Sequence, residues 1–461
     1  MKIVRTILAA LPLALAGCAL APPASTVEAP MPAQWQAPLP HNGSLTDLSG
    51  WWRQQGDPLL VQLIEAAQAV SPTISAAQSR IAQSRAERVA AGAALAPTLD
   101  AAASVNRASR QTTLPTGTLS QAALQASWEI DLFGARRAER NAAQARLAGA
   151  EAGWHEARVS VAAEVANQYY SLRACEQLLA VARQDAASRA DTARLTQLST
   201  DAGFQAPANA ALARASAADG NSRATQQRAL CDLDVKALVA LTALTEPELR
   251  QELAASAPVP APAIAMNALP AQLLAQRPDV FNAEREVAAA SFDVGSAQAQ
   301  RYPRLTLQGE VGTANFRTGG ANTSGGTWTI GPLALSVPVF DAGRRSANVD
   351  AAKARYDNAV AAYRASARQA VREVEEALVN LQSTAARSND AQVAMDGYRI
   401  AFVATEDRYK QGLGSLLELE DARRTRLAAE NAVVTLQRER NAAWIALYRA
   451  AGGGWTGPVA N

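Results

Sequence analysis

Along much of the chain the apolar residues recur with one of two periods, every second residue or about every three and a half. Four segments alternate apolar and polar side chains, which is the pattern of a β-strand with one apolar face. They are Thr98–Asn106, Gln121–Ile130, Arg304–Asn315 and Thr327–Val339. The last alternates less regularly because it contains Pro332 and Pro338. We expect polar, glycine-containing hairpin loops over 109–117 and 317–326.

Long helices are predicted around these strands. Between about 343 and 410, apolar residues step alternately by four and three positions, which is the heptad seam of coiled-coil packing. The seam consists of Tyr356, Val360, Tyr363, Ala367, Ala370, Val374, Ala377 and Leu381. An amphipathic helix in an ordinary bundle is the alternative, and the length of the segment argues against it. Further helices are expected over 72–95, 136–200, 205–243, 278–300 and 415–449.

The two halves of the chain resemble each other. At a constant offset of 209 residues, Trp154 pairs with Tyr363 and Gly203 with Gly412. At an offset of 206, Pro97 pairs with Pro303. A repeat of this length indicates two tandem copies of one unit, each with the order helix, strand, turn, strand, long helix, turn, helix. We place the first repeat over 56–254, a proline-rich linker over 255–267, the second repeat over 268–451 and a tail over 452–461.

The beginning of the chain has the features of a secretory signal. Lys2 and Arg5 precede a short apolar run, and small residues follow it. The sequence Leu15-Ala16-Gly17-Cys18 resembles the lipobox of bacterial lipoproteins, in which the chain is cut before the cysteine and lipid is attached to its thiol. We therefore expect a signal peptide over 1–17, a lipid on Cys18 and an extended segment over 18–55. An ordinary signal peptide with a chance cysteine is the alternative.

Composition argues against several other classes of protein. The formal net charge is +2, and removal of residues 1–17 would take away two basic residues and no acid, so nothing favours a nucleic-acid partner. The two histidines, His41 and His155, are far apart, which disfavours a histidine metal site or a His-based triad. No G-x-S-x-G, H-E-x-x-H or P-loop motif occurs. We expect no enzymatic activity, no metal and no cofactor beyond the lipid, and no transmembrane helix after the signal.

Two further cysteines lie symmetrically about a predicted turn. Cys175 is 28 residues before Gly203 and Cys231 is 28 residues after it, so antiparallel helices that reverse near Gly203 would bring them level. The second repeat has Thr384 and Arg440 at these positions. A disulfide is favoured in the oxidising periplasm, provided that the two Cα atoms lie within about 7 Å. Two buried free thiols are the alternative.

Several motifs together resemble one known family. They are the lipobox, the duplicated unit, "PVFDAGRR" (338–345), "YKQGLGSLLELEDARR" (409–424) and "GGGW" (452–455). In combination they are similar to the TolC family of outer membrane efflux proteins, in particular its lipoprotein branch of OprM-like and NodT-like proteins. The resemblance covers nearly the whole chain after the signal.

This resemblance implies an α+β membrane protein that acts as a homotrimer. Four strands from each chain would form a twelve-stranded outer-membrane β-barrel, continuous with a long periplasmic α-helical coiled-coil barrel, since four strands alone cannot close one. The partners implied are a periplasmic adaptor (membrane fusion) protein, an inner-membrane pump of the RND or a related type, and outer-membrane lipids. The function implied is passive exit of small molecules such as drugs.

The resemblance also implies a gate at the periplasmic end. Its positions here are Tyr409 before the second helical turn and Glu418 and Asp421 after it. Glu418 and Asp421 are three residues apart and therefore share a helix face. The alternative is that they are solvated residues paired with Arg423 or Arg424. Gly414 departs from the family, where some members carry a basic residue, and Asn209 and Leu212 replace any acidic counterpart in the first repeat.

Two other functions stay open from sequence. One is the outer-membrane component of a type I protein secretion system. The other is a lipid-anchored coiled-coil structural protein, which would explain the heptads but not the four alternating strands.

Overall fold

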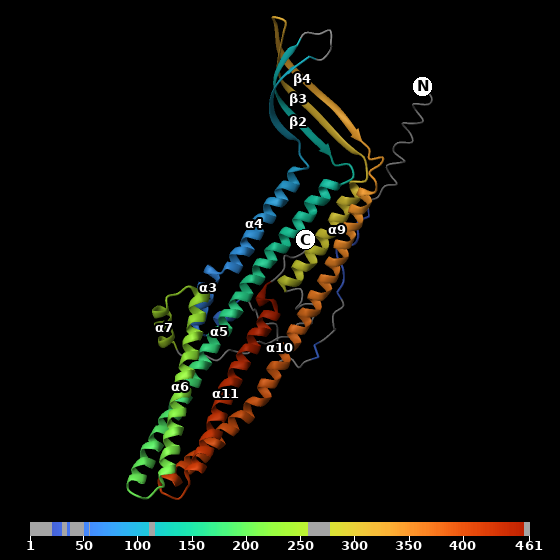
Figure 1. Cartoon of the computed structure of the whole chain (residues 1–461). Helices are drawn as coiled ribbons and strands as arrows, with labels where there is room; N and C mark the ends of the chain where they lie inside the picture. Colours follow the sequence, from blue (N-terminus) through green and yellow to red (C-terminus); the bar gives the residue numbers. More distant parts are fainter. Residues whose placement is uncertain are drawn as a thin grey trace. The chain divides into compact units, whose positions relative to one another are not determined.

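The computed structural model describes residues 21–29, 35–36, 50–54, 56–109, 116–256 and 277–455. They form two compact units, and each unit takes segments from both halves of the chain (Figure 1). The first contains residues 21–29, 78–152 and 281–366. The second is built mainly from 56–77, 153–256 and 367–455. This division differs from the two sequence repeats because strands of both repeats pair in one sheet.

The first unit contains a four-stranded antiparallel sheet in the order β1-β2-β3-β4. Its strands are β1 (Thr98–Ala108), β2 (Gly117–Ile130), β3 (Arg304–Thr318) and β4 (Ala321–Ser336). The central pair joins the two repeats, with Gly117 opposite Thr318 and Ile130 opposite Leu305. The alternation of apolar and polar residues thus predicted all four strands.

The register gathers the apolar side chains on one face of this sheet. One row across the strands contains Ala101, Leu124, Val311 and Trp328, and the next row contains Leu99, Ala126, Gly309 and Ile330. The intervening row is polar and contains Asp100, Gln125, Glu310 and Thr329. Residues directly opposite one another lie on the same face of a sheet, so one face is apolar and the other polar. Trp328 and Ile330 are 72% and 86% exposed, so nothing in the described part of the chain covers the apolar face there.

The second hairpin differs from its sequence prediction. A loop was expected over 317–326, but β3 extends to Thr318 and β4 begins at Ala321, so only Gly319 and Gly320 lie between the two strands. Backbone pairing needs no apolar side chains, so the polar stretch Ala321–Gly326 extends the ladder. Farther along, the register shifts between Leu307 and Gly309, which leaves Pro332 in an irregular part of β4.

The long helices lie close to their predicted bounds. They are α4 (Pro72–Ala93), α5 (Ala135–Asp201), α6 (Pro207–Thr242), α9 (Pro278–Ala299), α10 (Arg344–Lys410) and α11 (Leu416–Ala450). All six positions of the predicted heptad seam of α10 from Tyr363 to Leu381 are buried. Among the described residues no single helix has the length and apolar character to cross a membrane; the consecutive helices Pro58–Val70 and Pro72–Ala93 pass this test only as a pair, with a 50° bend between them.

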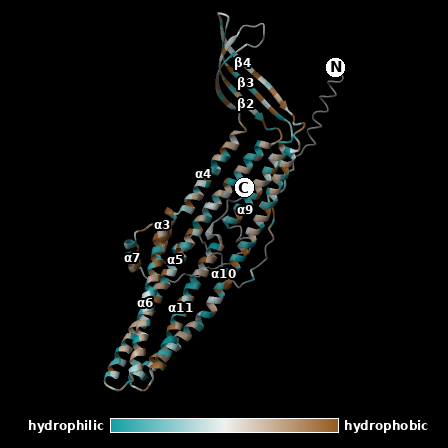
Figure 2. Ribbon diagram, viewed as in Figure 1, coloured by the Kyte–Doolittle hydropathy of each residue, from teal (hydrophilic) through white to brown (hydrophobic). Residues whose placement is uncertain are grey.

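Four short elements of the described chain were not predicted. They are α2 (Trp51–Gln54), α3 (Pro58–Val70), α7 (Glu246–Ala255) and the 3-10 turn η2 (Gly452–Gly454). Helix α3 begins at Pro58, and the Asp57 side chain caps it by accepting from the Leu60 backbone N–H at 3.1 Å. It is the strongly apolar helix in Figure 2. Its residues Leu60 and Leu63 enter the core of the second unit with Tyr169, Leu238 and Ile445.

Candidate functional site

The two helical hairpins of the second unit turn in the same way. At the first turn, the Gly203 N–H donates to Thr200 O and the Phe204 N–H to Ser199 O. At the second, the Gly412 N–H donates to Tyr409 O and the Leu413 N–H to Arg408 O. This pair of bonds is the Schellman motif, which requires a left-handed residue after the helix. Gly203 and Gly412 have φ of 81° and 76°, which explains why both repeats place glycine there.

Tyr409, one of the three predicted gate residues, joins the two hairpins. Its hydroxyl lies 2.6 Å from the Thr196 hydroxyl on α5. Thr196 Oγ1 also bonds to Thr192 O at 2.7 Å, so Thr196 donates there and Tyr409 donates to Thr196. The ring of Tyr409 packs against a small apolar cluster of Ala193, Ala213 and Leu416. The last turn of α10 therefore contacts α5 through the Tyr409–Thr196 hydrogen bond and through apolar packing of the Tyr409 ring.

Glu418 and Asp421 lie on the exposed face of α11. The Glu418 carboxylate accepts from the Ser415 N–H, and the Ser415 hydroxyl accepts from the Glu418 N–H, both at 3.2 Å. This capping box fixes the beginning of α11. Asp421 forms an ion pair with Arg424, whose side chain is 78% exposed. Within one chain, Glu418 thus caps a helix and Asp421 has the Arg424 partner that the alternative interpretation expected.

The opposite face of α11 carries a buried ionic network that sequence reasoning missed. The Arg423 side chain has no exposed area and donates to Glu420 Oε1 at 2.5 Å and to Thr192 Oγ1 at 2.9 Å. Arg189 on α5 donates to Asp185 at 2.8 Å and to Glu420 at 2.5 Å. Glu420 therefore bridges two arginines on different helices, which joins α5 to α11.

The arginine network is completed by Arg426. Its guanidinium lies 4.1 Å from the centre of the Phe402 ring on α10 and 3.7 Å from Asp185. Burial, with Arg189 nearby, lowers the pKa of Arg423, while Glu420 and Asp185 oppose that change. A signal was present in the sequence: Leu416, Leu419, Arg423 and Arg426 follow a 3-4-3 spacing, so the arginines occupy seam positions. Charged residues are seldom fully buried, which is why that spacing was not interpreted as a seam.

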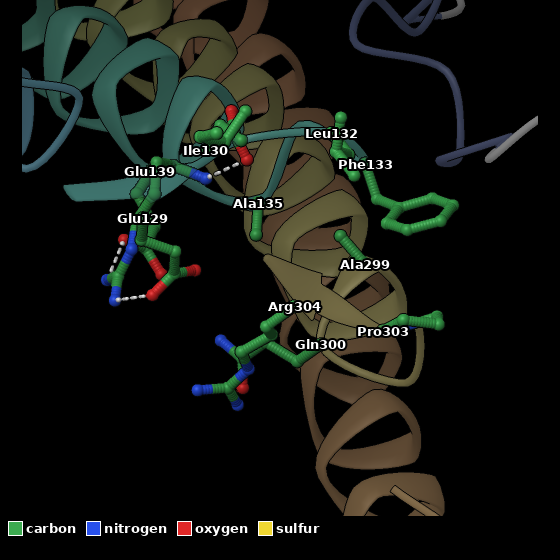
Figure 3. Close-up of a pocket in the computed structure, with 12 residues that line it drawn as sticks. Glu129, Ile130, Leu132, Phe133, Ala135, Glu139, Ala299, Gln300, Pro303 and Arg304 are labelled. Carbon is green, nitrogen blue, oxygen red and sulfur yellow. Dashed lines mark hydrogen bonds and ion pairs between the residues drawn. The ribbon is translucent and has the colours of Figure 1, made fainter. Parts of the chain in front are cut away.

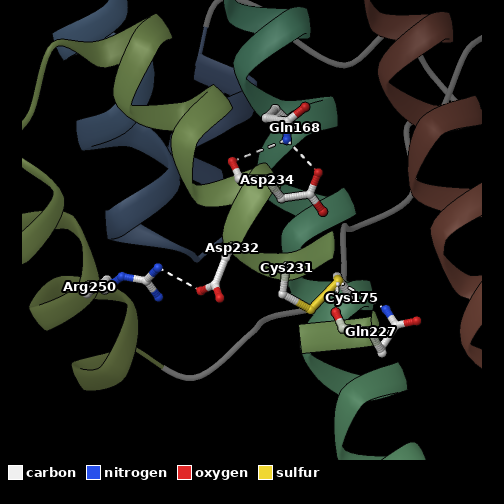
Figure 4. The surroundings of a disulfide bond; sticks show 7 residues. All are labelled: Gln168, Cys175, Gln227, Cys231, Asp232, Asp234 and Arg250. Carbon is white, nitrogen blue, oxygen red and sulfur yellow. Dashed lines mark hydrogen bonds and ion pairs between the residues drawn. A yellow bond between two sulfur atoms is a disulfide. The ribbon is translucent and has the colours of Figure 1, made fainter. Parts of the chain in front are cut away.

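Cys175 on α5 and Cys231 on α6 are joined by a disulfide (Figure 4). Their Cα atoms are 5.5 Å apart, within the range required for the bond. The Gln227 side-chain amide donates to Cys175 Sγ at 3.1 Å. The bond links the two helices of the first hairpin, and Thr384 stands at the corresponding position of α10.

A second polar anchor lies in the core of the second unit. The Tyr169 hydroxyl donates to Asp57 Oδ2 at 2.6 Å and accepts from Arg173 Nε at 3.1 Å. Arg173 donates onward to Leu253 O at 3.2 Å. Burial and the hydrogen bond to Asp57 raise the pKa of Tyr169 to about 12. This chain of bonds ties the cap of α3 to α5 and to the end of α7.

The other predicted sites are placed as follows. Cys18 lies outside the described residues. The Asn209 side-chain amide donates to Gln205 Oε1 at 2.7 Å, and Leu212 is 50% exposed. Neither residue is acidic, so the first turn has no counterpart of Glu418 and Asp421 at these positions. Within the described part of the chain no group of three or more His, Cys, Asp and Glu side chains could hold a metal ion.

A four-stranded sheet with an uncovered apolar face, combined with two long helical hairpins, defines the fold of an outer-membrane channel subunit. The family model described as outer membrane efflux protein matches residues 63–245 and 269–453. The chain belongs to this family.

Curated relatives match over nearly their whole length. The solvent efflux pump outer membrane protein SrpC of Pseudomonas putida is 30% identical, over 96% of this chain and 97% of the relative. The pyoverdine export outer membrane protein OpmQ of Pseudomonas putida is 32% identical, over 96% of each. Nodulation protein T of Rhizobium leguminosarum bv. viciae is 27% identical, over 98% of this chain and 94% of the relative.

Solved structures agree with this assignment. The outer-membrane channel OprN superposes with a TM-score of 0.82 at 27% identity, covering 95% of this chain and all of that one. The outer membrane protein VceC of Vibrio cholerae gives a TM-score of 0.76 at 26% identity, covering 88% of this chain and 98% of that one. The expected resemblance to TolC-family channels and the α+β fold are thereby confirmed.

Proposed function

We propose that three copies of this chain form a continuous outer-membrane channel, the exit duct of a tripartite efflux system. The observation that carries the proposal is the uncovered apolar face of the sheet, opposed by a polar face. In a barrel spanning a lipid bilayer the apolar face contacts lipid and the polar face lines the lumen. Four strands are too few to close a barrel, whereas twelve from three copies suffice.

The duct is passive and works with two partners. A periplasmic adaptor protein and an inner-membrane pump of the RND or a related type deliver the substrate and supply the energy. The substrates are small toxic molecules; solvent efflux in the name of SrpC and pyoverdine export in that of OpmQ support this class. The chain itself performs no reaction and needs no cofactor apart from the lipid on Cys18.

Glu418 and Asp421 gather around the channel axis in the trimer, with Tyr409 holding the adjacent helix end. Both carboxylates lie on the exposed face of α11, away from the buried Leu419 and Arg423. Three copies would place six carboxylates in a ring, which attracts cations and repels anions. Arg424 partly neutralises Asp421, so Glu418 contributes more of the ring's field.

The lipid on Cys18 adds a second membrane attachment to the strands. Channel formation need not depend on this lipid, because the strands of the barrel themselves anchor the trimer. Changing Cys18 to Ala should abolish lipid labelling and leave residues 1–17 attached. Unmodified Cys18 in protein extracted from membranes would refute lipidation without affecting the channel proposal.

The decisive experiment is deletion and complementation in the source bacterium. Loss of the gene should increase sensitivity to solvents or antibiotics and cellular retention of a fluorescent pump substrate, and the wild-type gene should restore both. If efflux is unchanged while a secreted protein disappears from the medium, the type I secretion alternative is correct. Purified protein that is monomeric by light scattering in detergent would contradict the trimer.

A further inference from the structure

Four connections between helices and strands lie at one edge of the sheet, and one of them, residues 94–97, joins α4 to β1. Strand β2 ends at Ile130, opposite Leu305, and β4 ends at Ser336, opposite Arg304. The other three connections are 131–134 to α5, 337–343 to α10 and 300–303 from α9. All belong to the first unit. We call the residues of these connections and the adjoining helix and strand ends the junction edge.

Arginines at the junction edge fall into two groups. Arg136 pairs with Glu129 at 3.3 Å and with Glu139 at 3.1 Å. Arg345 pairs with Asp341 at 2.8 Å. By contrast, Arg301, Arg304 and Arg344 are exposed, and within the described residues none of them has an acidic partner. Three guanidinium groups per chain are therefore available for an anion outside the chain.

Apolar side chains are exposed beside these arginines. Val339 and Phe340, before α10, are 92% and 89% exposed, and Leu132, before α5, is 51% exposed. The Phe133 ring stacks on the Tyr302 ring with centroids 4.9 Å apart. In Figure 3, Leu132 and Phe133 point away from Glu129 and Glu139. Exposed apolar side chains thus occur in the loops that connect strands to helices as well as on the sheet.

Exposed aromatic and aliphatic side chains next to unpaired basic groups are typical of a membrane–water interface. Apolar and aromatic residues sit at the boundary of the hydrocarbon layer, and basic residues attract anionic headgroups beyond it. Guanidinium groups bind phosphate oxygens by two parallel hydrogen bonds, which an ammonium group cannot reproduce. In both repeats an apolar loop is followed by two arginines, at 131–137 and 337–345, but in the first repeat both arginines have acidic partners.

We propose that the junction edge is a binding belt for anionic phospholipids, in which Arg301, Arg304 and Arg344 hold the lipid phosphates. The inference rests on the proposed function, because it requires the sheet to lie in a membrane. Val339, Phe340 and Leu132 enter the acyl boundary beside the bound headgroups. The belt fixes the depth of the barrel and stabilises the strand-to-helix connections. Its ligand is a phospholipid with net negative charge, such as phosphatidylglycerol.

The test compares lipid binding by the full-length trimer in a neutral detergent. Native mass spectrometry with added phosphatidylglycerol or phosphatidylcholine gives the affinity for each lipid. The wild type should prefer phosphatidylglycerol, and the triple variant Arg301→Gln/Arg304→Gln/Arg344→Gln should bind it at least about tenfold more weakly, since one basic residue near an anionic surface contributes about fivefold. Its affinity for phosphatidylcholine should change little. The corresponding triple lysine variant should recover part of the lost affinity.

The matched control is Arg80→Gln/Arg364→Gln/Arg368→Gln. These arginines are also exposed and without an acidic partner in the described chain, but they lie within α4 and α10. Arg364 is 20 residues into α10 from Arg344, roughly 30 Å along the helix. The control should retain wild-type affinity for phosphatidylglycerol. An equal loss in the control would show a net-charge effect and overturn the belt.

Three further results would also overturn it. The first is unchanged affinity for phosphatidylglycerol in the triple glutamine variant. The second is displacement of the lipid from the wild type by inorganic phosphate as readily as by unlabelled lipid. The third is loss of the trimer in the triple glutamine variant while its lipid affinity per chain is preserved. The second would indicate a free-phosphate site, and the third would indicate contacts with acidic groups of a neighbouring copy. Channel recording of the wild type in phosphatidylcholine bilayers separates the two proposals: absence of channels contradicts the proposed function, whereas channels without lipid preference contradict only the belt.

Discussion

The hydroxyl of Tyr409 lies 2.6 Å from the hydroxyl of Thr196, and this hydrogen bond joins the last turn of α10 to α5, one turn beyond a bond from Ser188 to Glu406. Thr196 keeps a second bond, to Thr192 O, that does not involve Tyr409. Removing the Tyr409 hydroxyl therefore loosens the contact between the hairpins without leaving Thr196 unsatisfied. Substitution of Tyr409 therefore measures how much this contact contributes to the stability of the packing between the two hairpins.

Tyr409→Phe should lower the stability of the helical unit by about 1 kcal/mol per chain, the net contribution of one hydrogen bond. It should also increase the fraction of time that single channels spend at their higher conductance. Thermal unfolding and bilayer recordings measure the two effects. Tyr398→Phe is the control, because Tyr398 is on the same helix, is 46% exposed and has no hydrogen bond among the described residues. Equal effects of the two variants would contradict a role for the Tyr409 contact.

Arg423→Met should destabilise the chain by about 3 kcal/mol, because the change removes one member of a buried ionic network. Glu420 would keep Arg189, whereas Thr192 would lose its charged donor. The neighbouring Arg424→Met removes a side chain that is 78% exposed and should cost less than about 1 kcal/mol. Chemical denaturation of both variants gives the comparison. Similar losses for the two would show that burial of Arg423 has no energetic consequence.

Much of the fold could be predicted from the sequence, because strand alternation and heptad spacing persist over long segments. The ends of α5 and α10 were predicted to within one residue by the glycine-containing turns that follow them. The second hairpin was mispredicted because the stretch Ala321–Gly326 has no apolar alternation, although its backbone still pairs. Helix α3 was missed because its residues Leu59, Leu60, Leu63 and Ile64 were not recognised as one apolar face.

The site was less predictable than the fold. Glu418 and Asp421 could be placed on one helix face from their spacing alone. Their local partners, Ser415 and Arg424, depend on rotamers that spacing does not determine. Arg423 and Arg189 were missed because charged residues are usually solvated, and only the packing of α5 against α11 brings Glu420 between them.

The disulfide between Cys175 and Cys231 should stabilise the first hairpin by about 4 kcal/mol on the loop-entropy model, because the cysteines are 56 residues apart. The double variant Cys175→Ala/Cys231→Ala should unfold at a lower temperature than the oxidised wild type. Reduction of the wild type should lower its unfolding temperature similarly and leave the variant unchanged. Thiol labelling of denatured, unreduced protein should detect neither cysteine. Two labelled thiols per chain would contradict the bond.

Alkaline pH should weaken the core of the second unit through Tyr169. Its pKa is raised from 10.0 to about 12, so the folded state binds the phenolic proton more tightly than the unfolded state does. The resulting stability is complete below about pH 10 and is lost as the pH rises through about 12. Unfolding temperatures measured across this interval should fall less steeply for Tyr169→Phe than for the wild type. The Tyr398→Phe control should follow the wild type, and identical slopes for all three proteins would contradict the assignment.

Glu418→Gln/Asp421→Asn should reduce the preference of the channel for cations and its block by multivalent cations, because neutral side chains no longer attract them. Reversal potentials in a potassium chloride gradient measure the preference. Asp357→Asn/Asp390→Asn is the charge-matched control, since both residues are exposed on α10 outside the turn. Unchanged selectivity and block in the first double variant would show that its carboxylates do not line the channel.

Single-channel recording of the purified trimer in a planar phosphatidylcholine bilayer tests the central claim most directly. Closure of a barrel by three four-stranded sheets predicts discrete, repeated conductance steps that appear with the trimeric fraction and are absent from the monomeric fraction. A bilayer that stays electrically silent, although the trimer has been shown by vesicle flotation to insert, would contradict the claim that this chain forms a channel.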